Sequence, residues 1–473
     1  MTRREAAVAL GSFGACLISV FMQMIDVTIV TTALPVVTED VGASQSQQLW
    51  VVAGYSLAFA CVLLTAARLG AIAGRRRMFL WSAAGFAAAS LWCGMSTSAS
   101  ELVLARIVQG VAGAGMAAQT IAVITASFRR DHQPYAFAAY GATAGFAGML
   151  GPVLGGVLIT VNPFGLGWHV IFLMNLPLGV LAVGLAWRYL RIGPAAQRPP
   201  LDLRGSVIAT AALFLLLIAL SDSQQSGWRP VHWGCAAAAL ALGGLFVVHE
   251  RLTRRAGGMA LVRLDLFGDK GFAVGSVLVA IFFGLFTAFV FTVSILLQVV
   301  LHFSVLRTGI AMTPFAIGAG AGALLSPRLV NRFGVRALAA GVVGFGGWVA
   351  VGVGYLYVES GAVNLALVTA PVFLAGFGVG VFGVPLQPIM LAGLDDDAMG
   401  EASGLLPTVE QIGNSVGLAV LSALFFRAHT LTGSMTMLSA IAVAALGLGA
   451  LTLALPDRRA VAGSTPWSRA ATA

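Results

Sequence analysis

The stretch Phe21-Met-Gln-Met-Ile-Asp-Val-Thr-Ile-Val-Thr-Thr-Ala-Leu-Pro-Val-Val37 places one carboxylate, Asp26, inside an apolar run that extends from Ala6 to Thr38. This run is longer than the roughly 20 residues that a helix needs to cross a bilayer. An ionised Asp at the middle of such a helix costs about 2.5–3.5 kcal/mol, and intramembrane acids commonly line water-filled cavities or proton paths. We predict a first membrane span in which Asp26 is functional. A structural acid that hydrogen-bonds Thr28 or a neighbouring helix is the alternative.

The composition extends this prediction to the whole chain. Hydrophobic residues make up 59% of the 473 residues and charged residues only 10%, against about 25% charged in a typical soluble domain. The net charge of +9 is compatible with nucleic acid or with an anionic membrane surface. Because the basic residues lie mainly between the apolar runs, we predict an all-α polytopic membrane protein that binds no nucleic acid.

Apolar runs of about 20 residues predict fourteen spans. The first seven lie near 8–36, 48–67, 78–98, 102–126, 135–160, 168–187 and 205–221. The other seven lie near 231–249, 271–297, 307–327, 337–357, 364–391, 403–426 and 435–455. With the N-terminus inside, most of the 27 Lys and Arg residues fall in tails and inner loops, as the positive-inside rule requires. Both termini are therefore expected in the cytoplasm.

A short repeat predicts two related halves. Arg68-Leu-Gly-Ala-Ile-Ala-Gly-Arg-Arg76 and Arg328-Leu-Val-Asn-Arg-Phe-Gly-Val-Arg336 share Arg-Leu, then Gly and Arg at matched offsets. We predict six-helix bundles at 1–190 and 268–456, related by an axis normal to the membrane, with a substrate site between them. Residues 191–267 would form a linker with two extra spans, and 457–473 a cytoplasmic tail.

Four stretches, in chain order, resemble the motifs of one family. They are Asp26-Val-Thr-Ile-Val-Thr-Thr-Ala-Leu-Pro35, Arg106-Ile-Val-Gln-Gly-Val-Ala-Gly113, Gly151-Pro-Val-Leu-Gly-Gly156 and Trp168-His-Val-Ile-Phe-Leu-Met-Asn-Leu-Pro-Leu-Gly179. They are similar to the span-1 signature, motif B, motif C and span-6 start of the fourteen-span drug:proton antiporters of the major facilitator superfamily. The resemblance covers nearly the whole chain and implies that family's fold and antiport activity.

The chain departs from this family in motif A, the loop after span 2. The family's Asp and following Arg are replaced by Ala71 and Ile72, whereas Gly74, Arg75 and Arg76 are present. In the family, that Asp is thought to help lock the halves together on the inner side when the cavity faces outward. We expect the resting equilibrium of this chain to lean inward, and we assign the three remaining residues to conformational change.

Proton coupling is assigned first to Asp26 and Arg106. Arg106 lies about 9 Å in from the outer end of its span, counted at about 1.5 Å per residue, and Asp26 lies in the outer half of its own span. A nearby guanidinium would favour the ionised carboxylate, and its departure would remove that preference. The resemblance also implicates this Arg in proton transfer. The alternative is a packed structural ion pair, or an Arg that hydrogen-bonds helix carbonyls.

Further polar residues within spans are candidates for coupling or substrate binding. Glu410, about two turns into its span, is a second proton-coupling candidate, or an acid that stays wetted or pairs with a loop Arg. With Asp26, we assign Gln109, Gln298 and Asn414 to the substrate cavity. Single polar residues in spans also commonly join helices to one another.

Glycines recur at helical steps in the fifth span, at 141, 145, 148 and 155. Such a face permits close backbone contact, and a proline bends the helix. The resemblance implies that this face helps the halves pack and limits leak. The residues that we assign to this conformational role are Gly148, Gly151, Pro152, Gly155 and Gly156.

No motif for soluble-type catalysis is found. The sequence has no phosphate-binding loop, no His-Glu-x-x-His helix and no Gly-x-Ser-x-Gly elbow. The four cysteines fall within apolar runs without metal-binding spacing. We therefore expect no enzyme, cofactor or metal, but a monomeric proton-coupled antiporter that exports amphipathic drugs or antibiotics across the bacterial cytoplasmic membrane. The alternatives are a dedicated exporter of one endogenous metabolite and a polytopic receptor without transport.

Overall fold

The structure is a computed structural model that describes residues 3–128, 133–190, 202–258, 261–359, 364–391, 393–394, 396–425 and 430–456. Its regular elements are helical throughout these ranges, so the all-α prediction is confirmed. The chain divides into two compact units, Met1–Val262 and Arg263–Ala473. The predicted tail at 457–473 lies outside the described residues.

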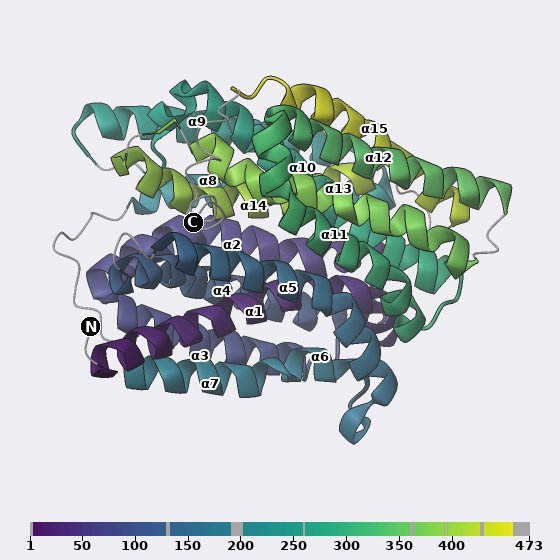
Figure 1. The fold of residues 1–473 in the computed structure, drawn as a ribbon, viewed down its shortest axis with the longest axis horizontal. Coiled ribbons are helices and arrows are strands. Elements are labelled where there is room, and N and C mark those ends of the chain that lie inside the picture. The colour runs from purple at the N-terminus through teal and green to yellow at the C-terminus, as the bar shows by residue number, and fades with distance from the viewer. Residues whose placement is uncertain are drawn as a thin grey trace. The chain divides into compact units, whose positions relative to one another are not determined.

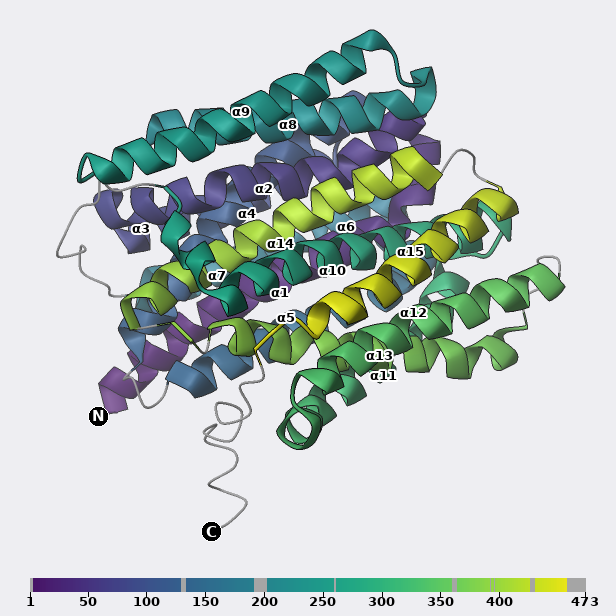
Figure 2. The ribbon, with the colours of Figure 1, turned by 90° about the horizontal axis from the view of Figure 1, so that it is seen from above.

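The first unit contains the helices α1 to α9 (Figure 1). Their bounds are α1 Arg3–Asp40, α2 Gln45–Ala73, α3 Arg75–Cys93, α4 Ala99–Ser127, α5 Gln133–Val161, α6 Val170–Leu173, α7 Asn175–Tyr189, α8 Leu203–Ser226 and α9 Pro230–Arg255. Two 3-10 turns, η2 Pro163–Gly165 and η3 Gly167–His169, connect α5 to α6. Helices α8 and α9 pack side by side, and α8 also packs on α2 (Figure 2).

The second unit contains α10 to α15. Their bounds are α10 Lys270–Ile295, α11 Val305–Phe333, α12 Val335–Val358, α13 Leu365–Leu391, α14 Asp396–Phe425 and α15 Leu431–Thr452. A 3-10 helix, η4 Leu264–Gly268, precedes α10, and a π-helical segment, η5 Leu296–Val300, follows it. Every predicted span coincides with helix, α6 and α7 together covering the sixth. The three-part domain division stays a prediction.

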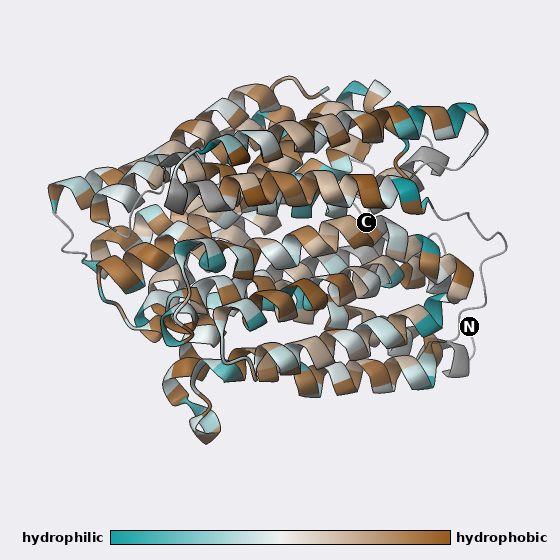
Figure 3. Cartoon of the chain, turned by 180° about the vertical axis from the view of Figure 1, so that it is seen from behind, coloured by the Kyte–Doolittle hydropathy of each residue, from teal (hydrophilic) through white to brown (hydrophobic). Residues whose placement is uncertain are grey.

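Helix composition confirms the membrane character of the chain. Among the described residues, eleven helices are long and apolar enough to cross a bilayer. Large apolar side chains such as Trp81, Leu240 and Leu324 are more than 70% exposed in the isolated chain. Figure 3 shows hydrophobic residues along the helices and hydrophilic residues gathered mainly towards helix ends and connections. Lipid contact explains such exposure. The count of fourteen spans stays a prediction.

The two units repeat one packing pattern. In the first, α1 packs against α5 and α7, α2 against α4, and α3 against both α4 and α7. In the second, α10 packs against α14 and α15, α11 against α13, and α12 against both α13 and α15. If α1 corresponds to α10, the neighbours correspond helix by helix. This recurrence supports the internal repeat predicted from the two basic loops.

Two glycines mark the repeated loop in the structure. Gly74 separates α2 from α3 at φ +100°, and Gly334 separates α11 from α12 at φ +60°. A residue with a side chain rarely adopts such a φ, so glycine permits the sharp change of direction. The matched glycines thus make equivalent connections in the two units.

Helix α5 meets α1 through two of its glycines. A Cβ on Gly151 would overlap Thr28 Oγ1 and lie 2.9 Å from the Ile29 amide nitrogen, and a Cβ on Gly155 would lie 2.8 Å from Ile29 Cγ1. By contrast, Gly148 has open space where its Cβ would be. Gly151 and Gly155 therefore make the close contact with α1, whereas the predicted conformational roles of these glycines stay predictions. Pro152 lies inside α5, and Gly156 on the same helix is buried.

Replacing Gly151 with Ala should destabilise the first unit. The added methyl group would force α1 and α5 apart, and such overpacking costs about 1–3 kcal/mol. Gly148→Ala is the matched control on the same helix, since the added methyl group meets open space. Thermal unfolding in detergent should give a lower midpoint for Gly151→Ala than for Gly148→Ala. Equal midpoints would show that the α1–α5 contact is looser than described.

Candidate functional site

An ion pair between α1 and α4 lies at the centre of the candidate site. Arg106 Nη1 on α4 donates a hydrogen bond to Asp26 Oδ2 on α1. The side chains of Arg106 and Asp26 are 1% and 0% exposed. The sequence placed Asp26 and Arg106 at a similar depth in their spans, and the structure shows them in direct contact.

Arg106 is also held by α2 and by its own helix. Its Nε donates to the carbonyl oxygen of Val51 at 3.1 Å, and its guanidinium lies 4.4 Å from the ring centroid of Tyr55. Nη1 additionally donates to Gln109 Oε1 at 2.6 Å. Residues three apart lie on the same face of a helix, which lets Gln109 reach the Arg106 side chain. Arg106 therefore links Asp26 and Gln109, the other two predicted site residues on α1 and α4.

The second oxygen of Asp26 binds two amide groups. Its Oδ1 accepts hydrogen bonds from Gln109 Nε2 at 2.8 Å and from Asn175 Nδ2 at 3.2 Å. The same two amides donate to Ser90 Oγ, at 2.8 and 3.3 Å. All of these side chains are buried. Asp26, Arg106, Gln109, Ser90 and Asn175 form one network, the Asp26 network, that joins α1, α3, α4 and α7.

Two members of this network were not selected from the sequence. Asn175 lies within the span-6 stretch that resembles the family motif, at the first residue of α7, and its polar side chain in an apolar run was an available signal. Ser90 gave no such signal, because a serine in a span commonly bonds its own helix backbone.

The candidate substrate-binding residues of the second unit, Gln298 and Asn414, form separate hydrogen bonds with nearby residues. Asn414 on α14 accepts a hydrogen bond from Thr287 on α10 at 2.6 Å and donates to Gln411 at 3.2 Å. Gln298 lies in η5 and donates to Ser294 Oγ at 2.9 Å. No direct hydrogen bond between Gln298 and Asn414 is found in the described part of this unit. Their substrate-binding roles stay predictions.

Glu410 lies on α14 one turn before Asn414 and is half-buried. No ion pair joins it to another residue that the structure describes. It thus differs from Asp26, whose charge is matched by Arg106. Its coupling role stays a prediction that rests only on its position within the span.

The residues that remain from motif A hold neighbouring helices of the first unit. Arg75 Nη1 donates to the carbonyl oxygen of Ala122 on α4 at 3.3 Å. Arg76 Nη2 donates to the carbonyl oxygen of Trp187 on α7 at 2.8 Å, and its guanidinium lies 5.5 Å from that indole ring. Both arginines directly follow Gly74, so the turn orients them towards two different helices.

Long apolar helices, a packing pattern repeated in two units and a buried charge pair define the class of the protein as a polytopic helical membrane protein. The sequence profile of the Major Facilitator Superfamily matches residues 16–418. The chain belongs to the Major Facilitator Superfamily and is a multi-pass protein of the cytoplasmic membrane.

Curated relatives include proteins named for antibiotic export. A probable actinorhodin transporter of Streptomyces coelicolor is 35% identical over 88% of this chain and 72% of its own length. The cephamycin export protein CmcT of Amycolatopsis lactamdurans is 33% identical over 94% of this chain and 92% of its own length. The tetracenomycin C resistance and export protein of Streptomyces glaucescens is 29% identical over 87% and 74%.

Solved structures confirm the fold. An auto-inhibited peptide transporter of the POT family has a TM-score of 0.65 at 17% identity, covering 96% of each chain. A point mutant of the nucleoside transporter NupG has a TM-score of 0.61 at 12% identity, covering 95% of this chain and 99% of that one. At this identity the similarity concerns the fold alone.

Breaking the buried pair should destabilise the protein more than removing both of its charges. Asp26→Asn or Arg106→Gln each leaves one buried charge without its counter-ion, which typically costs roughly 3–5 kcal/mol. The double variant leaves two neutral amides, so the sum of the single effects should exceed its effect by roughly 0.5–3 kcal/mol. Denaturant unfolding in detergent measures this cycle. Strictly additive effects would contradict direct coupling between the two side chains.

Proposed function

We propose that the protein exports amphipathic drug-like or antibiotic molecules in exchange for protons, by alternating access of a cavity between two six-helix bundles. The single observation that supports proton coupling best is the buried Asp26 network. A carboxylate and a guanidinium that share hydrogen bonds inside a membrane protein commonly mark a proton or substrate path. Export is supported by the names of the bacterial relatives.

Proton binding to Asp26 would disturb the pair directly. A protonated Asp26 no longer compensates Arg106, which would then be a buried charge without a counter-ion. Arg106 is held on α2 by Val51 and Tyr55, so we propose that α1 is the helix that moves away on protonation. A proton would thereby change the position of α1, and a movement of α1 would change the proton affinity of Asp26.

The finer assignments belong to this proposal. Fourteen spans with both termini in the cytoplasm follow from the apolar runs and the positive-inside bias. Asp26, Gln109, Gln298 and Asn414 would contribute polar groups to the substrate cavity, and Glu410 would be a second coupling residue. The transporter would act as a monomer with lipid, protons and the exported molecule as its partners.

A dedicated exporter of one self-made antibiotic is the second candidate. Three relatives carry the name of a single antibiotic, namely actinorhodin, cephamycin and tetracenomycin C. Another relative, from Mycobacterium tuberculosis, is named a multidrug resistance protein and favours a broad substrate range. Both candidates use the same proton-coupling chemistry. They differ in how many different compounds the protein exports.

Gradient-driven transport tests the coupling role of Asp26. Inverted vesicles that contain the wild-type protein should accumulate ethidium only when a pH gradient is imposed, because the proton supplies the energy. Asp26→Asn should abolish the gradient-dependent part, since an amide does not bind and release a proton in this range. Fluorescence quenching of the dye measures uptake.

Glu39→Gln is the matched control, because Glu39 is an exposed acid on the same helix. It should keep wild-type uptake. If Asp26→Asn membranes keep their full dependence on the gradient, Asp26 is not the coupling residue. If wild-type membranes move no dye, the broad-substrate candidate is wrong and the dedicated exporter takes its place.

A separate prediction concerns the departure from motif A. Ala71 lies in the last turn of α2, three residues before Gly74. Restoring the acid with Ala71→Asp should shift the population towards the outward-facing state, if that acid locks the inner side. Distances between spin labels on the two units measure the shift. Unchanged distances would contradict the inward-leaning equilibrium expected for Ala71.

A further inference from the structure

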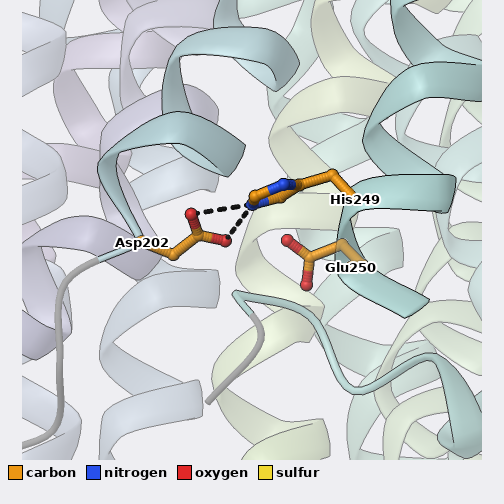
Figure 4. Close-up of side chains that lie close together, drawn as sticks. All are labelled: Asp202, His249 and Glu250. Atoms are coloured by element: carbon orange, nitrogen blue, oxygen red, sulfur yellow. Dashed lines mark hydrogen bonds and ion pairs between the residues drawn. The ribbon is translucent and has the colours of Figure 1, made fainter. Parts of the chain in front are cut away.

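Away from the Asp26 network, three metal-ligating side chains meet where α8 begins and α9 ends. Asp202 is the N-cap of α8, and its Oδ1 accepts a hydrogen bond from the Gly205 amide at 2.8 Å. His249 and Glu250 are consecutive residues near the end of α9. Figure 4 shows the three side chains converging, and one ligand atom from each lies within 4.8 Å of the others.

The imidazole of His249 faces the Asp202 carboxylate. His249 Nε2 lies 3.0 Å from Asp202 Oδ1 and 3.1 Å from Oδ2. The side chains of His249 and Asp202 are 23% and 9% exposed, so the pair lies mostly inside the protein. This arrangement by itself fits an ion pair between a protonated imidazole and a carboxylate.

Glu250 is not explained by that ion pair. It is 1% exposed, its Oε2 accepts a hydrogen bond from the Val262 amide at 2.8 Å, and no donor among the described residues reaches its Oε1. A Cβ on Gly205 would lie 2.9 Å from this Oε1 and would also meet Asp202 Oδ2. Two carboxylate oxygens therefore border the same small space. A buried oxygen without a donor is unfavourable, and a cation would satisfy it.

We propose that Asp202, His249 and Glu250 bind one divalent transition-metal cation, with Zn²⁺ as the best match. One imidazole nitrogen and two carboxylate oxygens are ligands that Zn²⁺ accepts, and three protein ligands leave a fourth tetrahedral position for water. The two carboxylates supply a charge that matches the cation. Mg²⁺ and Ca²⁺ prefer six or more oxygen ligands, so an imidazole in the set disfavours them.

The distances suit a shared ion after small side-chain rotations. Donor atoms that bind one zinc ion at about 2.0–2.2 Å lie roughly 3.3–3.6 Å apart in tetrahedral geometry. The 3.0 Å between His249 Nε2 and Asp202 Oδ1 is slightly shorter, and the largest separation in the set stays within 4.8 Å. Because Asp202 and His249 are 47 residues apart in sequence, their spacing gives no metal-binding motif.

A bound cation would fix three segments of the first unit together. It would join the start of α8 to the end of α9, and Glu250 would extend this connection to Val262 through the amide hydrogen bond. Val262 is the last residue of the first unit. The ion would therefore anchor the point at which the chain passes into the second unit, and its role would be structural rather than part of proton coupling.

Direct binding tests this proposal. The full-length protein would be purified in detergent, freed of its affinity tag and of metal, and titrated with ZnCl₂ by isothermal calorimetry. We expect about one ion per chain. His249→Gln and Glu250→Gln should each weaken binding at least about tenfold, since loss of an outer-shell partner alone typically costs that much.

His302→Asn is the matched control, because it removes an exposed imidazole elsewhere in the chain at a φ of +54° that Asn tolerates. It should bind Zn²⁺ like the wild type, and an excess of Mg²⁺ or Ca²⁺ should not compete. Absence of stoichiometric binding to the wild type, or unchanged affinity in both variants, would overturn the site and leave an ion pair or a proton shared between the carboxyls.

A spectroscopic titration covers the case in which the variants fail to fold. CoCl₂ added to the metal-free wild type should produce visible d–d absorption that saturates near one equivalent and disappears when Zn²⁺ is added. Absence of saturable bands in the wild type would overturn the proposal without any variant. Circular dichroism of each variant shows which of the two readouts applies.

Discussion

The compensation of one buried charge by another is the constraint on which the first unit depends. Asp26 and Arg106 are each nearly inaccessible to solvent, and neither would be tolerated there alone. The amides of Gln109 and Asn175 satisfy the second carboxylate oxygen, and the Val51 carbonyl accepts a hydrogen bond from Arg106 Nε. These contacts come from α1, α2, α4 and α7. A change in the Asp26–Arg106 ion pair would therefore be accompanied by a change in the packing of these helices.

The same first unit shows how small residues permit this arrangement. Gly151 and Gly155 let α5 approach α1 at the turn directly after Asp26, where Thr28 and Ile29 lie. Any side chain there would push the two helices apart. Two kinds of contact thus fix the position of α1. They are the hydrogen bonds of Asp26 and the close packing of the α5 glycines against Thr28 and Ile29. The second unit has equivalent close contacts, such as the one between Gly284 on α10 and Gly417 on α14.

The sequence was sufficient to predict the helical class, the cytoplasmic membrane and the family, because apolar runs and ordered motifs depend on local composition. It also placed Asp26 and Arg106 at similar depth. It did not predict that Ser90 and Asn175 would complete the network, because their contacts depend on how α3 and α7 rotate about their axes. Asp202, His249 and Glu250 escaped notice because only the packing of α8 on α9 brings them together.

The one-residue connections at Gly74 and Gly334 have a consequence for motion. A helix pair joined by a single residue has no slack, so α2 and α3, like α11 and α12, are tethered firmly at that end. Rearrangement within a unit must then be absorbed elsewhere, at connections with several residues such as 41–44 and 94–98. Reporter groups intended to follow the transport cycle belong at those longer connections, where the change of chain direction is spread over several residues.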